Sequence, residues 1–183
     1  LAELGAIIHV NSRTVGECER LVEEINSKGF RAIVASFDVK NEEAVKEYAD
    51  SLRQLDVLIN NSYAGIGGTI LSASMDDYID SYQSSVVASA NLTKVFEPFL
   101  SEAASLRGNA SIINVASMYG MVSPDARIYD TIEGTNPPFY GAAKAAMIQL
   151  TKYAACELAD KNIAVNAVTP AGAKTRILDQ MSK

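Results

Sequence analysis

A tyrosine and a lysine stand four residues apart in the segment YGAAKAA, at Tyr140 and Lys144. In a helix, residues four apart lie one turn above each other, so both side chains would emerge on one face. An ammonium beside a phenol stabilises the phenolate and lowers the pKa of the phenol, which lets a tyrosine act as a general acid or base near neutral pH. Helices often carry such a pair by chance, so the spacing predicts proton transfer only where other residues support it.

A serine, Ser117, follows directly after the apolar run ASIINVA. If that run is a strand of a parallel sheet, Ser117 lies at its carboxyl end, where open α/β sheets bind their ligands. Its hydroxyl would then hold a substrate oxygen while Tyr140 moves the proton, although an isolated serine is more often a turn residue. The one histidine, His9, lies inside another apolar run, so no histidine-based metal site is predicted.

The elements that would position these residues are short apolar runs alternating with amphipathic stretches, a pattern typical of parallel strands joined by helices. The predicted strands cover residues 6–11, 31–37, 55–59, 110–116 and 163–168. Helices are predicted to follow a capping box at Thr14 and Glu17, to be capped by Asn41 and by Ser74, and to begin at Pro138. The pattern therefore predicts an α/β protein.

Length and charge exclude several classes of protein. The chain has 183 residues, enough for one domain, and a formal net charge of −6, which argues against nonspecific binding to nucleic acid or to an anionic membrane. No apolar run is long enough to span a bilayer, and the opening LAELGAIIHV lacks the charged start of a signal peptide, so a cytoplasmic location is predicted. That opening looks like the last turn of a helix and the chain stops inside another, so we expect a partial domain.

Four segments resemble landmarks of the short-chain dehydrogenase/reductase family, and they occur in the family's order. They are DVLINN at 56–61, NVAS at 114–117, YGAAKAA at 140–146 and NIAVNAVTP at 162–170. The resemblance covers nearly the whole chain. It implies a Rossmann-like fold, a doubly wound parallel sheet in three α/β/α layers, in a single domain whose first strand and glycine-rich phosphate loop would precede residue 1.

The resemblance also implies a reaction, the interconversion of an alcohol and a carbonyl, with hydride supplied by a nicotinamide cofactor. Tyr140 would protonate or deprotonate the reacting oxygen, and Ser117 would hold that oxygen. Lys144 would bind the nicotinamide ribose and assist Tyr140. The family's helical asparagine, counted from the aromatic residue at Tyr78, falls on Ser85, which would hold a water for proton relay less effectively.

By the same resemblance, the cofactor site combines residues from several turns. These are Asp38 and Val39 at the adenine, Asn60 and Asn61 beside the adenine and ribose, Tyr140 and Lys144, and Pro170 and Thr175 near the nicotinamide. NAD-preferring relatives place an acidic residue where this chain has Ser12. No carboxylate there repels a 2′-phosphate, and the guanidinium of Arg13 follows, so the charges predict NADP(H) rather than NAD(H). The alternative is that Arg13 is only a solvated loop residue.

Two departures from the family's pattern concern the substrate. The Asn-Asn-Ala-Gly turn contains two extra residues, Ser62 and Tyr63, and Tyr63 would stack near the cofactor, touch the substrate or only fill space. The loop between Ser117 and Tyr140 is unusually long and polar, so it is either a substrate lid or a surface excursion. Its SMYG and NPP segments resemble members associated with surface-sugar biosynthesis, which favours a polyhydroxylated or sugar-derived small molecule as substrate.

Three functions stay open. The first is an NADP(H)-dependent reductase or dehydrogenase, and the second is a nucleotide-sugar epimerase or dehydratase that keeps its cofactor bound. The third is a cofactor-binding homologue without turnover, which the shift from asparagine to Ser85 would explain. Relatives form dimers and tetramers through the tyrosine-bearing helix and the long helix before it, so a homodimer or homotetramer is expected.

Overall fold

The computed structural model describes residues 1–65 and 67–171 of the chain. The chain forms two compact units, Leu1–Leu52 and Arg53–Lys183, and each is described by itself. Every strand pair in the described residues is parallel, and helices connect the strands, so the α/β class expected from the sequence is confirmed.

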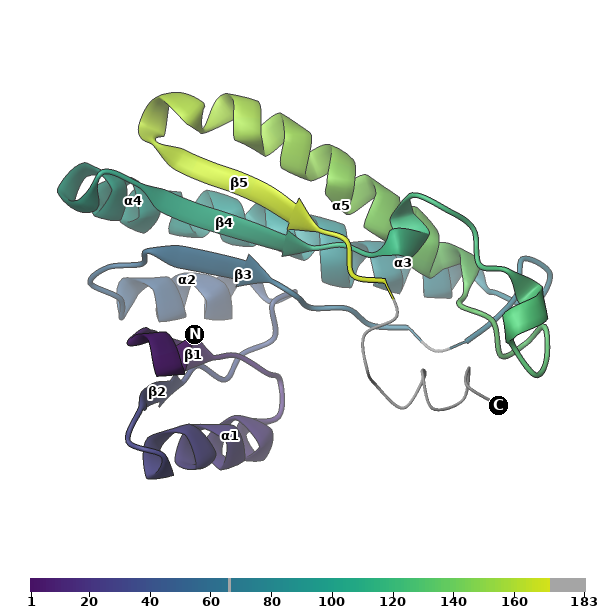
Figure 1. Cartoon of the computed structure of the whole chain (residues 1–183), viewed down its shortest axis with the longest axis horizontal. Helices are drawn as coiled ribbons and strands as arrows, with labels where there is room; N and C mark the ends of the chain where they lie inside the picture. Colours follow the sequence, from purple (N-terminus) through teal and green to yellow (C-terminus); the bar gives the residue numbers. More distant parts are fainter. Residues whose placement is uncertain (66, 172–183) are drawn as a thin grey trace. The chain divides into compact units, whose positions relative to one another are not determined.

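The first unit contains one βαβ crossover followed by a helix. Strand β1 (Ile7–Val10) pairs with β2 (Arg31–Val34), and α1 (Val15–Ser27) connects them, while α2 (Glu42–Asp50) follows β2 (Figure 1). A short 3₁₀ turn, Ala2–Leu4, precedes β1. The side chain of Asn41 caps α2 as predicted, because it accepts hydrogen bonds from the backbone N–H groups of Glu43 and Ala44.

The predicted capping box at the start of α1 is wrong. Thr14 precedes the helix, but its side chain makes no capping hydrogen bond. Glu17 instead forms an ion pair of 3.1 Å with Arg20, one turn further along the same helix. The sequence has the residue types of a capping box, but the capping hydrogen bond of Thr14 does not form. The exposed Glu17 side chain pairs with Arg20 on the same helix face.

The second unit is a three-stranded sheet in the order β3–β4–β5, with bounds Val57–Asn60, Ala110–Val115 and Ile163–Val168. A long helical crossover joins β3 to β4 and consists of α3 (Met75–Tyr82), a π-helical turn (Gln83–Val87) and α4 (Ala88–Arg107). Helix α5 (Pro138–Glu157) joins β4 to β5. The capping of α3 by Ser74 and the start of α5 at Pro138 are confirmed, whereas the π-helical turn was not predicted.

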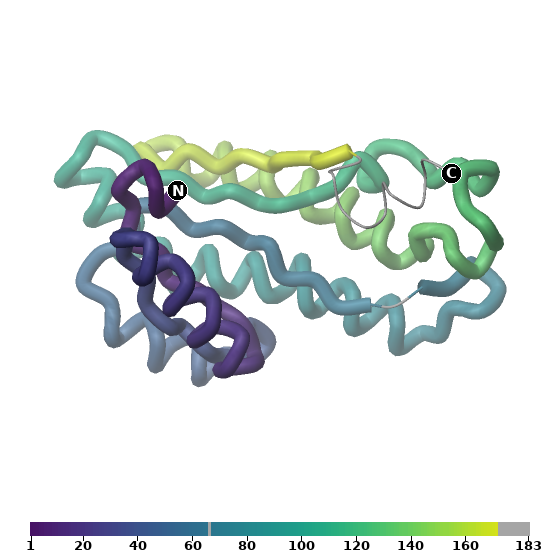
Figure 2. Tube along the Cα trace, turned by 60° about the horizontal axis from the view of Figure 1, so that its bottom comes forward, coloured from purple at the N-terminus to yellow at the C-terminus, as the bar shows by residue number. Residues whose placement is uncertain are grey.

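Helices α4 and α5 cover the same face of this sheet, as Figures 1 and 2 show. Alternate residues of β4 and β5 point to that face and form one apolar core with the two helices, and Leu58 of β3 packs against it. The core consists of Leu100, Ala103, Ala104, Ala110, Ile112, Ala154, Leu158, Ile163 and Val165. Because the three strands are parallel, their carboxyl ends lie at one edge of the sheet, and the residues that follow β3, β4 and β5 emerge there.

Short 3₁₀ turns and a long loop follow β4 at that edge. The turns are η3 (Met118–Gly120) and η4 (Ala126–Ile128), and a third, Ala159–Lys161, follows α5. The loop from 121 to 137, drawn in green, lies at the end of the second unit toward which the strands point (Figure 2). Within the part of the chain that the structure describes, no helix is both long and apolar enough to cross a membrane.

Candidate active site

Ser117 lies two residues beyond the end of β4 and is 6% exposed. Its side-chain oxygen accepts a hydrogen bond of 3.2 Å from the backbone N–H of Tyr119, and this bond caps the start of η3. Backbone hydrogen bonds on either side of Ser117 tie it to the exit of β5, from Ala116 to Val168 and from Met118 to Pro170. The hydroxyl hydrogen of Ser117 has no acceptor among the described residues, so it is free to be donated to a substrate oxygen.

Tyr140 and Lys144 lie one turn apart near the start of α5, and the lysine is 3% exposed. The Nζ of Lys144 donates a hydrogen bond of 2.6 Å to the carbonyl of Val115, the last residue of β4. The same nitrogen lies 5.7 Å from the centroid of the Tyr140 ring. Burial lowers the pKa of Lys144, because removing an ammonium from water disfavours its charged form.

Two glycines let η3 and α5 approach each other closely. A Cβ atom on Gly120 would lie 2.7 Å from the backbone carbonyl carbon of Lys144, and one on Gly141 would lie 2.8 Å from the backbone oxygen of Tyr119. Real side chains do not tolerate such distances to backbone atoms. The backbone that carries Ser117 is therefore packed directly against the helix that carries Tyr140 and Lys144, and the structure brings the three predicted residues together.

The residues at the end of β3 belong to a buried polar network. Asn60 donates a hydrogen bond of 2.8 Å to the side-chain oxygen of Asn114 in β4, and Asn114 donates one of 2.8 Å to Thr151 in α5. The side-chain oxygen of Asn60 is buried without a partner among the described residues. Asn61, the second predicted asparagine, is exposed. The network orients the end of β3 relative to β4 and α5.

Ser85 lies in the π-helical turn and is fully buried. Its hydroxyl donates a hydrogen bond of 2.5 Å to the carbonyl of Ser81, one turn back along the same helical segment. That proton is therefore engaged within the helix, and the structure does not bring the Ser85 hydroxyl to Tyr140 or Lys144 as a donor. A role for Ser85 in proton relay stays a prediction.

One tyrosine packs on Tyr140 and two others pair beside η3, and these contacts were not predicted. The ring of Tyr63, in the two-residue insertion, lies edge-to-face against the Tyr140 ring. The hydroxyls of Tyr119 and Tyr129 form a hydrogen bond of 2.7 Å, which joins η3 to the loop from 121 to 137. Burial and the hydrogen bond to Tyr129 raise the pKa of Tyr119 to about 12. The only sequence signal for this cluster is the density of tyrosines in these loops.

The predicted adenine-side residues lie in the first unit, in the turns after β1 and β2. The side-chain oxygen of Ser12 accepts a hydrogen bond of 3.2 Å from the backbone of Thr14. Arg13 is exposed, and no described residue forms an ion pair or hydrogen bond with its guanidinium. The side chain of Asp38 accepts a hydrogen bond from the backbone N–H of Lys40, and Val39 is half-buried. Arg13 is therefore available to an anion.

Two predicted residues follow β5. Pro170 is exposed, and its carbonyl accepts the hydrogen bond from Met118. Thr175 lies outside the described residues.

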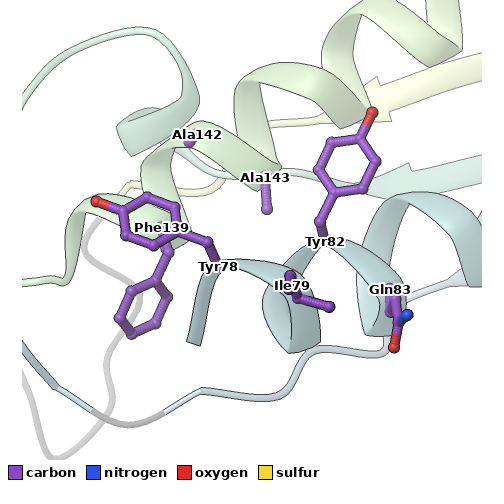
Figure 3. A pocket seen from close by; sticks show the side chains of 7 residues that line it. All are labelled: Tyr78, Ile79, Tyr82, Gln83, Phe139, Ala142 and Ala143. Carbon is purple, nitrogen blue, oxygen red and sulfur yellow. The ribbon is translucent and has the colours of Figure 1, made fainter. Parts of the chain in front are cut away.

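A separate apolar cavity of about 340 Å³ lies between α3 and α5 (Figure 3). It is lined by Tyr78, Ile79, Tyr82, Gln83, Phe139, Ala142 and Ala143. The ring of Phe139 is buried and meets Tyr78 edge-to-face at 5.7 Å. None of Ser117, Tyr140 and Lys144 lines this cavity, so it is distinct from the acid–base group.

The chain is similar to known proteins in sequence and in fold. The family model described as short chain dehydrogenase matches residues 1–183, so the chain belongs to the short-chain dehydrogenase family. A tropinone reductase homologue of Arabidopsis thaliana is 29% identical over 175 residues, which are 93% of this chain and 60% of that protein. The chain thus spans about 60% of the length of this curated relative.

Solved structures show the fold. The Pseudomonas aeruginosa RhlG/NADP active-site complex matches with a TM-score of 0.84 at 23% identity, over 100% of this chain and 69% of that one. L-sorbose reductase from Gluconobacter frateurii, complexed with NADPH and L-sorbose, matches with a TM-score of 0.78 at 27% identity, over 93% and 61%. The expected class, a doubly wound parallel sheet of the Rossmann type in three α/β/α layers, is confirmed.

Replacing either glycine at the contact between η3 and α5 is expected to damage the site. In the full-length protein, Gly120→Ala or Gly141→Ala pushes the two backbones apart, which separates Ser117 from Tyr140. We expect kcat/KM to fall roughly 10- to 100-fold and the free energy of unfolding in urea to fall by about 1–3 kcal/mol. The control is Gly16→Ala, since a Cβ there meets no atom within 4 Å. It should keep its activity, and normal turnover in Gly120→Ala would contradict the assignment.

Proposed function

We propose that the full-length protein is an NADP(H)-dependent oxidoreductase that interconverts an alcohol and a carbonyl group on a small molecule. The observation that carries this proposal is the Lys144 ammonium, buried at the carboxyl end of β4 and 5.7 Å from the ring of Tyr140. A cation in that place stabilises the phenolate that remains when the phenol gives up its proton. Membership of the short-chain dehydrogenase family supports the same reaction.

The chain's free hydrogen-bonding groups fit a nicotinamide cofactor and a carbonyl substrate. Lys144 carries three N–H donors and uses one on Val115, which leaves two for ribose hydroxyls. Ser117 has an unused O–H donor for the reacting oxygen. The nicotinamide ring, when bound, supplies or accepts the hydride.

During reduction, the chain's residues would hold the carbonyl oxygen and protonate it. Ser117 donates a hydrogen bond to that oxygen and orients it. Tyr140 transfers its phenolic proton to the same oxygen as negative charge develops there. Lys144 stabilises the resulting phenolate, and oxidation of an alcohol runs through the same residues in reverse.

The preference for NADP(H) over NAD(H) is supported by charge at the turn after β1. Ser12 offers no carboxylate to repel a 2′-phosphate, and the exposed guanidinium of Arg13 has no partner among the described residues. Two structural neighbours support it further, since one is a complex with NADP and the other a complex with NADPH.

A polyhydroxylated substrate is the chemistry we propose for the site. The neighbour at 27% identity holds L-sorbose, a sugar. The hydroxyl of Tyr129, in the loop from 121 to 137, lies 2.7 Å from the hydroxyl of Tyr119, which ties this loop to the turn that follows Ser117. We infer that this loop covers the substrate. The cytoplasmic location and a single Rossmann-like domain of which residues 1–183 form part stay predictions from the sequence.

A homodimer or homotetramer would cover the apolar cavity between α3 and α5. Ile79 and Tyr82, which line it, are each 48% exposed, and grouped exposed apolar side chains favour a contact with another protein surface. Sedimentation of the full-length protein should give the mass of two or four copies. A monomer at micromolar concentration would contradict this part of the proposal.

A cofactor-binding protein without turnover is the second candidate, and one observation favours it. The Ser85 hydroxyl is engaged with Ser81 and does not offer its proton to a relay. Measuring whether NADPH is consumed with a panel of sugar ketones and aldehydes distinguishes the two candidates. Binding without consumption would support the second candidate, and turnover without net consumption would point to an epimerase or dehydratase.

The variant Tyr140→Phe tests the reaction. It keeps the ring and removes the proton, so we expect kcat to fall about 10²- to 10⁴-fold, while NADPH affinity, followed by fluorescence, stays unchanged. Tyr153→Phe is the matched control, because Tyr153 lies on the same helix and is 67% exposed. Retained turnover in Tyr140→Phe would exclude the proposed mechanism.

The variant Arg13→Ala tests the cofactor preference. Loss of a charged hydrogen bond to the 2′-phosphate should lower the ratio of kcat/KM for NADPH over NADH about 10- to 100-fold. Arg20→Ala is the control, since Arg20 is an exposed arginine paired with Glu17 on the same unit. An unchanged ratio in Arg13→Ala would contradict a role of Arg13 in binding the 2′-phosphate.

A further inference from the structure

The two-residue insertion after β3 is anchored on the π-helical turn. Ser62 donates a side-chain hydrogen bond of 2.8 Å to the carbonyl of Ser84, and the side chain of Ser84 accepts one of 3.0 Å from the backbone N–H of Ala64. Ser84 is 4% exposed. One buried serine therefore bonds both sequence neighbours of Tyr63, so the position of this tyrosine is determined by the helix and not by a free loop.

The ring of Tyr63 touches both members of the acid–base pair. Its centroid lies 4.7 Å from that of Tyr140, with the two planes at 86°, the edge-to-face arrangement that aromatic pairs prefer. The Lys144 ammonium lies 5.8 Å from the Tyr63 centroid, nearly the same distance as from the Tyr140 ring. Such distances allow a cation–π attraction. The buried ammonium is thus bounded by two aromatic rings.

The hydroxyl of Tyr63 contributes no hydrogen bond that would explain a tyrosine here. It is buried and has no partner among the described residues, and no hydrogen bond of good geometry joins it to the nearby Ser81. Gly65 leaves the space that this hydroxyl occupies, because a Cβ on Gly65 would overlap it and would lie 2.8 Å from the Phe139 ring. The ring is therefore confined between Gly65 and Tyr140, and its contacts are the feature to be explained.

We propose that Tyr63 is a positioning residue, whose ring holds the Tyr140 ring in the orientation for proton transfer and keeps water from the Lys144 ammonium. It acts through Tyr140 and Lys144 and donates nothing to the substrate. A phenol free to rotate would spend less time aligned with the substrate oxygen, and small misplacements of reacting groups lower the rate strongly. The inference rests on the proposed function and adds a residue that the family's pattern does not contain.

Three variants of the full-length protein test the role of the ring. Tyr63→Leu removes the ring, and we expect kcat to fall about 3- to 10-fold, with the KM for the carbonyl substrate and the Kd for NADPH changed less than about twofold. Tyr63→Phe keeps the ring and removes the buried, unpaired hydroxyl, so it should keep the wild-type kcat and raise the Tm by a few degrees. Phe99→Leu breaks an aromatic contact with Phe96 in α4 and should leave kcat unchanged.

The kinetic outcomes are decisive when kcat is expressed per NADPH-binding site. A role confined to stability would lower the Tm of Tyr63→Leu and leave kcat per site unchanged, which would overturn the proposal. A loss of kcat in Tyr63→Phe equal to that in Tyr63→Leu would also overturn it, because the hydroxyl and not the ring would then matter.

Crystal structures of the two Tyr63 variants separate this proposal from the proposed function. The Tyr140 ring should keep its orientation in Tyr63→Phe and leave it in Tyr63→Leu. If the wild-type protein shows no turnover with NADPH or NADH, the proposed function fails, and the orientation of Tyr140 still decides the role of Tyr63. An unmoved Tyr140 ring in Tyr63→Leu would exclude positioning by Tyr63 whatever the activity.

Discussion

The hydrogen bond from Lys144 to the carbonyl of Val115 joins a buried cation to the last residue of β4. A buried ammonium is costly unless it is hydrogen-bonded, since the interior solvates charge poorly. The bond reduces that cost and at the same time fixes where α5 lies along the sheet. Burial lowers the pKa of Lys144, and a partly neutral lysine would lose its effect on a phenolate, so every contact that favours the charged form supports the chemistry.

The surroundings of this bond divide into an apolar part and a polar part. Toward the amino ends of β4 and β5, the sheet and helices share an apolar core of alanine, leucine, isoleucine and valine. Toward the carboxyl ends, Asn60, Asn114 and Thr151 form a chain of hydrogen bonds beside a second apolar cluster, which includes Ala116, Ala143 and Met147. Such networks specify geometry more sharply than apolar contacts do, because hydrogen bonds have preferred directions. The site end of these elements therefore combines apolar packing with a directional hydrogen-bond network.

Two kinds of contact restrict the position of Tyr140. Gly120 and Gly141 bring backbones into direct contact, so the distance between η3 and α5 has little freedom. The Tyr63 ring packs on the Tyr140 ring, and the hydrogen bond between Tyr119 and Tyr129 ties η3 to the loop from 121 to 137. A proton-transfer group held in this way loses little entropy when a substrate arrives, which is the general source of rate in preorganised sites.

The sequence by itself determined the parallel strands, where the helices start, and that Ser117 follows a strand while Tyr140 and Lys144 share a helix. These depend on periods of two and of 3.6 residues, on local caps and on short motifs, which the chain carries within a few residues. It did not determine the failed cap at Thr14, where an ion pair between Glu17 and Arg20 forms instead. Only the tertiary structure decided that Ser85 bonds back to Ser81 in a π-helical turn, and that Tyr63 packs on Tyr140. The contact of Tyr63 with Tyr140 joins residues more than 70 positions apart in the sequence, and the π-helical turn contains one extra residue. No local sequence pattern encodes either feature.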